Sequence, residues 1–180
     1  MVEFKELWYR HPANEAVTYP CVAPHQLQNL EGVTIRQGFP VFGNQCAIRM
    51  GVCLKRSGIS LATLGRVDTC GVHERDEMHI IRANDLAGAL ARAKIPGVGP
   101  VEKITGTEAA HFYPKIFGRT GMIYVMDYWR RAGETTPTGD HIDVWNGYRS
   151  STKWLMEWFS WLGYYSNYAE AREIWFWEVK

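Results

Sequence analysis

The 180-residue chain lacks several features that would assign it to a broad class of protein at once. Its four cysteines are too few for a disulfide scaffold, and none of them forms a Cys-x-x-Cys metal pattern. We therefore expect neither a metal nor a cofactor. Cys21 and Cys70 could pair in an oxidising compartment, but the sequence alone does not decide their connectivity.

Other absences limit where the chain acts and what it binds. No stretch approaches the roughly 18 successive apolar residues that a membrane span needs. The N-terminus, from Met1 to Trp8, has early acidic residues and no apolar signal-peptide core, so we expect synthesis in the cytoplasm without a signal peptide. A net charge of +1 and the lack of Lys/Arg runs give no electrostatic argument for nucleic acid. We expect neither nucleic acid nor a membrane as a partner.

Aromatic residues, by contrast, are abundant. Eight Trp and nine Tyr are present, and many of the Trp follow Trp145. Such rings suit sugar or peptide grooves and partner interfaces, but a thick aromatic core explains most of them equally simply. The aromatic segment 153–168 has no assigned role.

Length and composition fit one domain over residues 1–180. Apolar periodicity and capping residues predict helices over 3–10, 46–57, 84–94, 107–112 and 152–161. Alternation predicts strands over 78–82, 121–127, 141–146 and 173–179, with loops over 12–42 and 96–106. Because helices come first, the predicted fold is α+β, with N-terminal helices packed on a mostly antiparallel sheet.

Cys46 is the cysteine whose position favours chemistry. It follows Gly43-Asn44-Gln45, where a turn becomes a helix, and the positive end of a helix dipole favours a thiolate. The unpaired N–H groups of a first helical turn could also stabilise a tetrahedral oxyanion. Cys53 lies on the buried stripe of the same helix. It illustrates the alternative interpretation, in which such a cysteine is a small apolar core residue.

His141 lies at the start of an alternating strand, with Asp143 and Trp145 on the same face. A carboxylate two positions away can set the tautomer of an imidazole. We therefore assign Cys46 as the nucleophile, His141 as the base and Asp143 as the orienting acid.

The other histidines have weaker claims to a functional role. His11, His25 and His111 lie near loops or prolines. His73 and His79 stand among acidic residues, which indicates a solvated charged face rather than a metal site.

The block that runs from Cys46 through Ala-Ile-Arg-Met resembles the nucleophile motif of the type VI secretion amidase effectors, family 4. The Arg119-Thr-Gly-Met-Ile strand, the Gly-Asp-His141-x-Asp-x-Trp-Asn-Gly block and a terminal Trp-Phe-Trp strand follow in the family's order. The resemblance covers the chain from about residue 40 to its end. It implies a papain-like fold of the NlpC/P60 type.

The same resemblance implies a cysteine DL-endopeptidase that cleaves the γ-D-glutamyl–meso-diaminopimelate bond of peptidoglycan stem peptides. It also implies delivery by the type VI secretion apparatus into the periplasm of rival cells, and a cognate immunity protein. This sequence departs from the family pattern beyond the histidine, where Ser150, Ser151 and Thr152 replace an acidic group. Asp143 therefore receives that role, with Asp140 as the next choice.

Two other functions fit the same residues. A cysteine acyltransferase or thioesterase would use the same acyl-enzyme and differ only in the acceptor. A non-catalytic, Trp-rich cell-wall-binding module would leave Cys46 with a structural role.

Overall fold

The computed structural model describes residues 1–14, 19–29, 32–130, 135–151 and 168–180. The predicted helix over 152–161 lies outside the described residues, as does the aromatic segment apart from Tyr168. The α-helices are α1 (Phe4–Arg10), α2 (Cys46–Arg56), α3 (Leu61–Leu64), α4 (Ala83–Arg92) and α5 (Tyr113–Ile116). The strands are β1 (Leu27–Gln28), β2 (Thr34–Ile35), β3 (Val98–Thr105), β4 (Gly121–Trp129), β5 (Gly139–Trp145) and β6 (Glu173–Val179).

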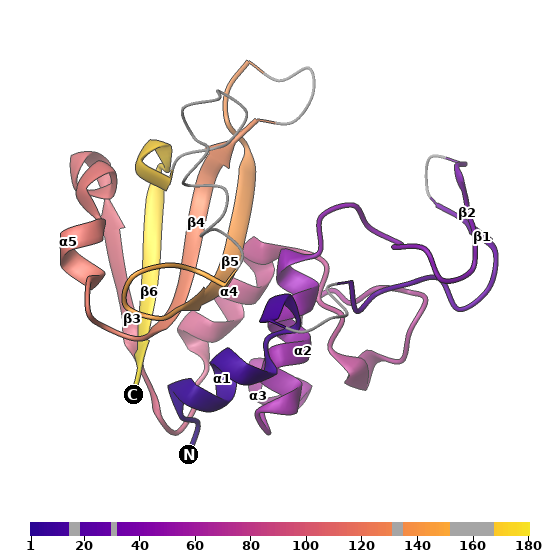
Figure 1. Cartoon of the computed structure of the whole chain (residues 1–180), viewed down its shortest axis with the longest axis horizontal. Coiled ribbons are helices and arrows are strands. Elements are labelled where there is room, and N and C mark those ends of the chain that lie inside the picture. Colours follow the sequence, from indigo (N-terminus) through magenta and orange to yellow (C-terminus); the bar gives the residue numbers. More distant parts are fainter. Residues whose placement is uncertain (15–18, 30–31, 131–134, 152–167) are drawn as a thin grey trace.

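Strands β3, β6, β4 and β5 form one sheet in that order, and every neighbouring pair is antiparallel. Among the described residues, β5 is therefore an edge strand that pairs with β4 alone, with His141 opposite Val125 and Asp143 opposite Ile123. Figure 1 shows helices α1 to α4 gathered beside β5, whereas β1 and β2 lie away from the sheet. The edge of β5 thus faces the helices.

The sheet separates two apolar cores because its side chains alternate between faces. Ile142 and Val144 of β5 join the core that contains α2 and α4, together with Tyr124 and Trp177. Trp145 joins the opposite core. The other members of that second core include Phe112, Ile116, Ile123, Val125, Tyr168 and Phe176. The alternation predicted for β5 is confirmed.

A third, smaller core lies against a different side of α2. Ile48 and Val52 of that helix pack with Cys21 and Cys70. The helix approaches this region very closely at Gly51, where an added Cβ would lie 2.1 Å from the carbonyl oxygen of Met78. Helix α2 is thus held between the sheet and the irregular segment 65–82.

Most predicted elements are confirmed, and the errors have local causes. The predicted loop 96–106 is wrong, because β3 occupies it as the second edge strand. Gly99 and Pro100 lie at its register shift, which is where an edge strand tolerates proline. The predicted strand 78–82 is also wrong. Met78 adopts a left-handed conformation with φ of 56°, and only an isolated bridge joins Ile80 to Thr69.

Three smaller differences concern the ends of elements. Helix α4 begins at Ala83, so Asn84 and Asp85 lie in its first turn instead of capping it. The predicted loop 12–42 includes the short strands β1 and β2. The predicted helix 107–112 is a 3-10 helix over Gly106–His111, followed directly by α5. Within the described residues, no helix has the length and apolarity that crossing a membrane requires.

Candidate active site

Cys46 is the first residue of α2, and the residues before it fix the start of the helix. The side chain of Gln45 is buried and bonds both backbone groups of Cys21, accepting from its N–H at 3.0 Å and donating to its carbonyl at 2.8 Å. Asn44 Oδ1 accepts the N–H of Cys46 at 3.1 Å. This first-turn N–H is therefore already hydrogen-bonded, unlike the unpaired groups expected at the start of a helix.

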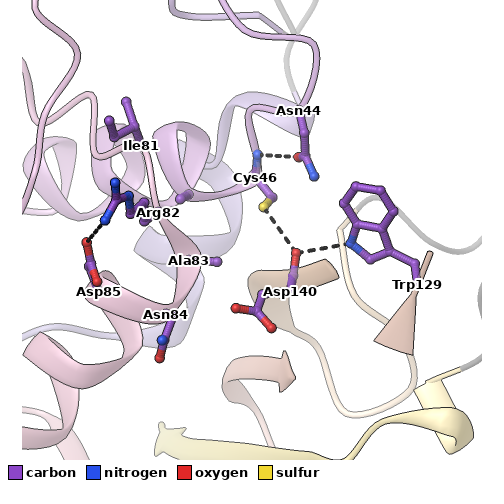
Figure 2. A pocket seen from close by; sticks show the side chains of 10 residues that line it. Asn44, Cys46, Ile81, Arg82, Ala83, Asn84, Asp85, Trp129 and Asp140 are labelled. Atoms are coloured by element: carbon purple, nitrogen blue, oxygen red, sulfur yellow. Dashed lines mark hydrogen bonds and ion pairs between the residues drawn. The ribbon is translucent and has the colours of Figure 1, made fainter. Parts of the chain in front are cut away.

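The thiol of Cys46 faces the edge of β5. Its Sγ lies 4.0 Å from the carbonyl oxygen of Asp140, a contact drawn in Figure 2. Hydrogen bonding from the backbone of Ile142 and Ala47 also lowers the pKa of this thiol. Because an edge strand has backbone groups that no neighbouring strand uses, β5 can bring such donors to a thiolate.

His141 completes the environment that favours ionisation of Cys46. Burial raises the pKa of the Cys46 thiol, but the hydrogen bond to His141 and its charge outweigh burial and hold that pKa below its ordinary value. Burial instead raises the pKa of Cys53, and burial with the neighbouring Cys70 raises the pKa of Cys21 to about 12. The structure therefore favours a thiolate at Cys46 over those two cysteines.

The imidazole of His141 lies between the thiol and a buried carboxylate. Its Nε2 is 3.3 Å from Asp143 Oδ2. Burial alone would lower the pKa of His141, but the hydrogen bonds to Asp143 and to Cys46 raise it to about 9. These two opposite pKa shifts favour a thiolate–imidazolium pair over the neutral thiol and imidazole.

Asp143 is fully buried and has partners on both carboxylate oxygens. Oδ1 accepts hydrogen bonds from the Ser151 hydroxyl and from the N–H of Val144, and it lies 3.5 Å from Nε2 of His11. Burial would raise the pKa of this carboxyl, but His11, His141 and Ser151 together hold it well below its usual range. Asp143 therefore remains an anion despite its burial.

His11 and Ser151 were not foreseen as members of this site. The Ser151 hydroxyl also lies 3.2 Å from Nδ1 of His11, so the two side chains meet on Asp143. Ser151 falls in the region where the family pattern places an acidic group, which is the one signal that could have indicated it. His11 comes from the end of α1 and carries no recognisable motif.

Asp140, the second choice for the acidic role, has a different position. Its Oδ1 accepts the N–H of Asp127 at 3.0 Å, and its carbonyl oxygen accepts the indole N–H of Trp129 at 3.3 Å. Asp127 has a φ of 50°, unusual for a residue other than glycine, within the register shift between β4 and β5. The Asp140 carboxylate supports this bulge beside the site.

A cavity of about 370 Å³ opens beside the thiol. Figure 2 shows Cys46 and Trp129 on opposite sides of Asp140 and, further away, the ion pair between Arg82 and Asp85. The cavity is lined by Asn44, Cys46, Ala47, Ile81, Arg82, Ala83, Asn84, Asp85, Trp129 and Asp140. It therefore combines the thiol of Cys46 with charged groups of both signs.

Residues 42–177 match the model of the type VI secretion system amidase effector protein 4 family, Tae4. The chain belongs to the Tae4 family. No curated protein sequence matches the chain. The match contains Cys46, His141, Asp143 and Ser151, but neither His11 nor Cys21.

Solved Tae4 structures share the fold along the whole chain. Tae4 from Enterobacter cloacae has a TM-score of 0.60 and 18% identity, covering 100% of this chain and 98% of that one. Tae4 of the Salmonella typhimurium effector–immunity system Tae4/Tai4 has a TM-score of 0.57 and 16% identity, covering 100% of this chain and 99% of that one. The same effector in complex with Tai4 from Enterobacter cloacae has a TM-score of 0.56 and 18% identity, with 99% of both chains covered. These likenesses confirm the α+β fold.

A second cluster of reactive side chains lies at the third core. Cys21, Cys70, His73 and His79 converge there, and both cysteines are free thiols. His79 is only 4% exposed, so the expectation of a solvated charged face is wrong for it. The acidic neighbours Glu74 and Asp76 are exposed, whereas the side chain of His79 is buried. The charged sequence around this histidine therefore does not report its environment.

Proposed function

We propose that this member of the Tae4 family is a cysteine hydrolase with a single papain-like domain over residues 1–180. The observation that carries the proposal is the hydrogen-bonded series from the Cys46 thiol through His141 to Asp143, beside a cavity. A nucleophile, a base and an orienting acid are the three parts that such an enzyme needs. The proposed substrate is the γ-D-glutamyl–meso-diaminopimelate bond of peptidoglycan stem peptides.

The proposed reaction has two steps. The Cys46 thiolate attacks the carbonyl carbon, the C–N bond breaks, and the His141 imidazolium gives its proton to the leaving amine. A water molecule then loses a proton to His141 and attacks the thioester, which releases the carboxylic acid and regenerates the thiol. Asp143 fixes the orientation of the imidazole and stabilises its positive charge in both steps.

The lining of the cavity supports a charged peptide as substrate. Its volume of about 370 Å³ falls within the range of small-molecule pockets. Arg82 and Asp85 form an ion pair at 4.0 Å in its wall, and Asn84 lies beside them. Diaminopimelate carries ammonium and carboxylate groups, so a wall with charges of both signs suits its recognition.

The relatives suggest how the activity is delivered and restrained. Tae4 of Salmonella typhimurium forms an effector–immunity system with Tai4. We propose by analogy that a cognate immunity protein binds this chain in the producing cell, and that the type VI secretion apparatus delivers it into the periplasm of target cells.

A muropeptide assay tests the proposed reaction. Purified chain is incubated with tetrapeptide muropeptides, and the products are analysed by mass spectrometry. We expect loss of the diaminopimelyl-alanine portion with uptake of one water, and no reaction with Cys46→Ala. Transfer of the acyl group to a second muropeptide amine would identify an acyltransferase instead. Intact muropeptides with an active-site thiol that still reacts with a thiol reagent would contradict the proposed substrate.

A further inference from the structure

The cluster at the third core has the chemical composition of a metal site. Cys21, Cys70, His73 and His79 each offer one ligand atom, and these four atoms all lie within 4.8 Å of one another. Cys21, Cys70 and His79 are buried, and His73 is half-buried. Two thiols and two imidazoles in one buried place are a typical zinc ligand set.

The distances between ligand atoms fit tetrahedral coordination. Zn–S bonds of about 2.3 Å and Zn–N bonds of about 2.0 Å place neighbouring ligand atoms roughly 3.3 to 3.8 Å apart. Nδ1 of His73 lies 3.3 Å from Cys70 Sγ and 3.7 Å from Cys21 Sγ, and Nδ1 of His79 lies 3.7 Å from Cys70 Sγ. Three sulfur–nitrogen separations are therefore already those of a zinc site.

We infer that Cys21, Cys70, His73 and His79 bind one zinc ion, in a structural site separate from the Cys46 cavity. Two thiolates and two neutral imidazoles balance the charge of Zn²⁺, so a buried complex carries no net charge. All four positions of the tetrahedron come from the protein, which leaves none for a substrate.

The surroundings of the ligands support this assignment. Nε2 of His79, the ring nitrogen that faces away from the cluster, lies 3.6 Å from Glu77 Oε2. A carboxylate on the outer nitrogen is the usual second contact of a zinc-binding histidine. The N–H of Cys70 donates to the carbonyl of His79 at 2.8 Å, so the backbone already closes the loop that carries three of the ligands.

The zinc site joins two irregular segments to the helix of the proposed nucleophile. Between α3 and α4, the described chain contains one 3-10 helix, over Arg75–Glu77, and no other helix or strand. An isolated bridge pairs Thr69 with Ile80. The fourth ligand, Cys21, is clasped at both backbone groups by Gln45, the residue before Cys46. Zinc would therefore fix the segment before α2 as well as the loop packed on it.

Metal analysis of the full chain tests the inference. The chain is produced with zinc in the medium, purified under reducing conditions without chelators, and analysed by plasma mass spectrometry for metal per chain. We expect about one zinc per chain. Cobalt exchanged into the site should give the absorption bands of a tetrahedral ion and a thiolate charge-transfer band. A strong chelator should lower the Tm by roughly 10 °C, since the folded chain alone binds the ion.

A double variant locates the site. Cys70→Ser with His73→Gln should reduce bound zinc about tenfold or more, since two of four ligands are lost. The matched control, Cys53→Ser with His111→Gln, changes the same residue types outside the cluster and should keep the zinc. Serine at position 53 can still donate to the carbonyl of Leu7, as Cys53 does at 3.2 Å.

Three results would overturn the zinc site. One is a folded wild-type chain with less than about a tenth of an equivalent of zinc after growth in zinc. Another is equal zinc in the double variant and its control. The last is a Cys21–Cys70 disulfide in the freshly purified chain, visible as a mass two hydrogens lower, because oxidised sulfurs cannot serve as thiolate ligands. If the double variant fails to fold, the metal content and cobalt spectrum of the wild type still decide.

Discussion

At the scale of single residues, Cys46 and Cys53 lie on one helix in positions that favour different roles, catalysis for Cys46 and packing for Cys53. Cys46 lines the cavity at the first turn of α2, while Cys53 lies two turns later with no exposed surface. We expect Cys46→Ala to abolish turnover and to change the free energy of unfolding by less than about 1 kcal/mol. Cys53→Ala should keep turnover and cost about 1 to 3 kcal/mol, because it leaves a buried gap. Activity assays and thermal unfolding of both variants check this, and hydrolysis by Cys46→Ala would refute the mechanism.

Asp143→Asn tests the orienting role of the carboxylate. The amide can still accept from Ser151 and Val144, so the fold should survive, but its NH₂ group facing His141 Nε2 favours the wrong tautomer. Such a change costs about 10⁴ in a serine-protease triad, and we expect roughly 10² to 10³ in kcat here because the thiol is already biased toward ionisation. His141→Ala should cost at least as much. A raised KM with kcat unchanged would mean that Asp143 only binds substrate.

The opposite pKa shifts of Cys46 and His141 predict the pH dependence of kcat/KM. The proposed mechanism requires the thiolate and the imidazolium together, so activity should rise as Cys46 ionises below its ordinary pKa and fall as His141 loses its proton near pH 9. In the Asp143→Asn variant, the alkaline limb of the pH profile should move to lower pH. The Asp143 anion raises the pKa of His141, and the variant lacks that anion. An alkaline limb that stays in place would show that another group titrates there.

The three proposed catalytic residues could be predicted from sequence because each lies in a local pattern. A turn that leads into a helix indicates Cys46, and strand alternation places His141 and Asp143 on one face. The contacts of His11 with Asp143 and Ser151 join segments from opposite ends of the chain, so no local spacing reports them. Long-range contacts of this kind follow from tertiary packing alone.

At the scale of elements, the sheet was predictable where its strands are buried. Strands β4, β5 and β6 have continuous or alternating apolar residues, and their predicted positions are confirmed. Strand β3 was not predicted, because most of its side chains are not buried and the apolar pattern in its sequence is therefore weak. The strand exists because its backbone pairs with β6, which side-chain pattern does not reveal.

Two glycines inside helices give a matched test of how α2 packs. A Cβ added at Gly51 would lie 2.1 Å from the carbonyl oxygen of Met78. Among the described residues, a Cβ added at Gly88 of α4 would meet only the flexible end of Arg92, at 3.3 Å. We expect Gly51→Ala to cost about 1 to 3 kcal/mol through overpacking. Gly88→Ala should be neutral or stabilise by up to about 1 kcal/mol through helix propensity. Denaturant unfolding measures both, and similar effects of the two changes would contradict the close approach.

At the scale of the whole molecule, the candidate site is assembled from segments that are distant in the sequence. The sheet supplies His141 and Asp143 through β5, and the helical N-terminal region supplies Cys46 and His11. The chain ends are tied to this framework, since the N–H of Phe4 donates to the carbonyl of Lys180 at 2.9 Å. The site therefore forms only when these distant segments fold together. For this reason, local sequence motifs do not identify all of its residues.

The proposed substrate lies outside the inner membrane, so toxicity should depend on the compartment that the chain reaches. Expression in a bacterial cytoplasm should be tolerated, because peptidoglycan stem peptides of the mature wall are not accessible there. Fusion to a periplasmic export signal should lyse the cells, and the same fusion carrying Cys46→Ala should not. Turbidity and microscopy of induced cultures measure the outcome, with immunoblots showing equal export of the two fusions. Equal toxicity in both compartments would point to an intracellular target, and lysis by the Cys46→Ala fusion would separate toxicity from cysteine chemistry altogether.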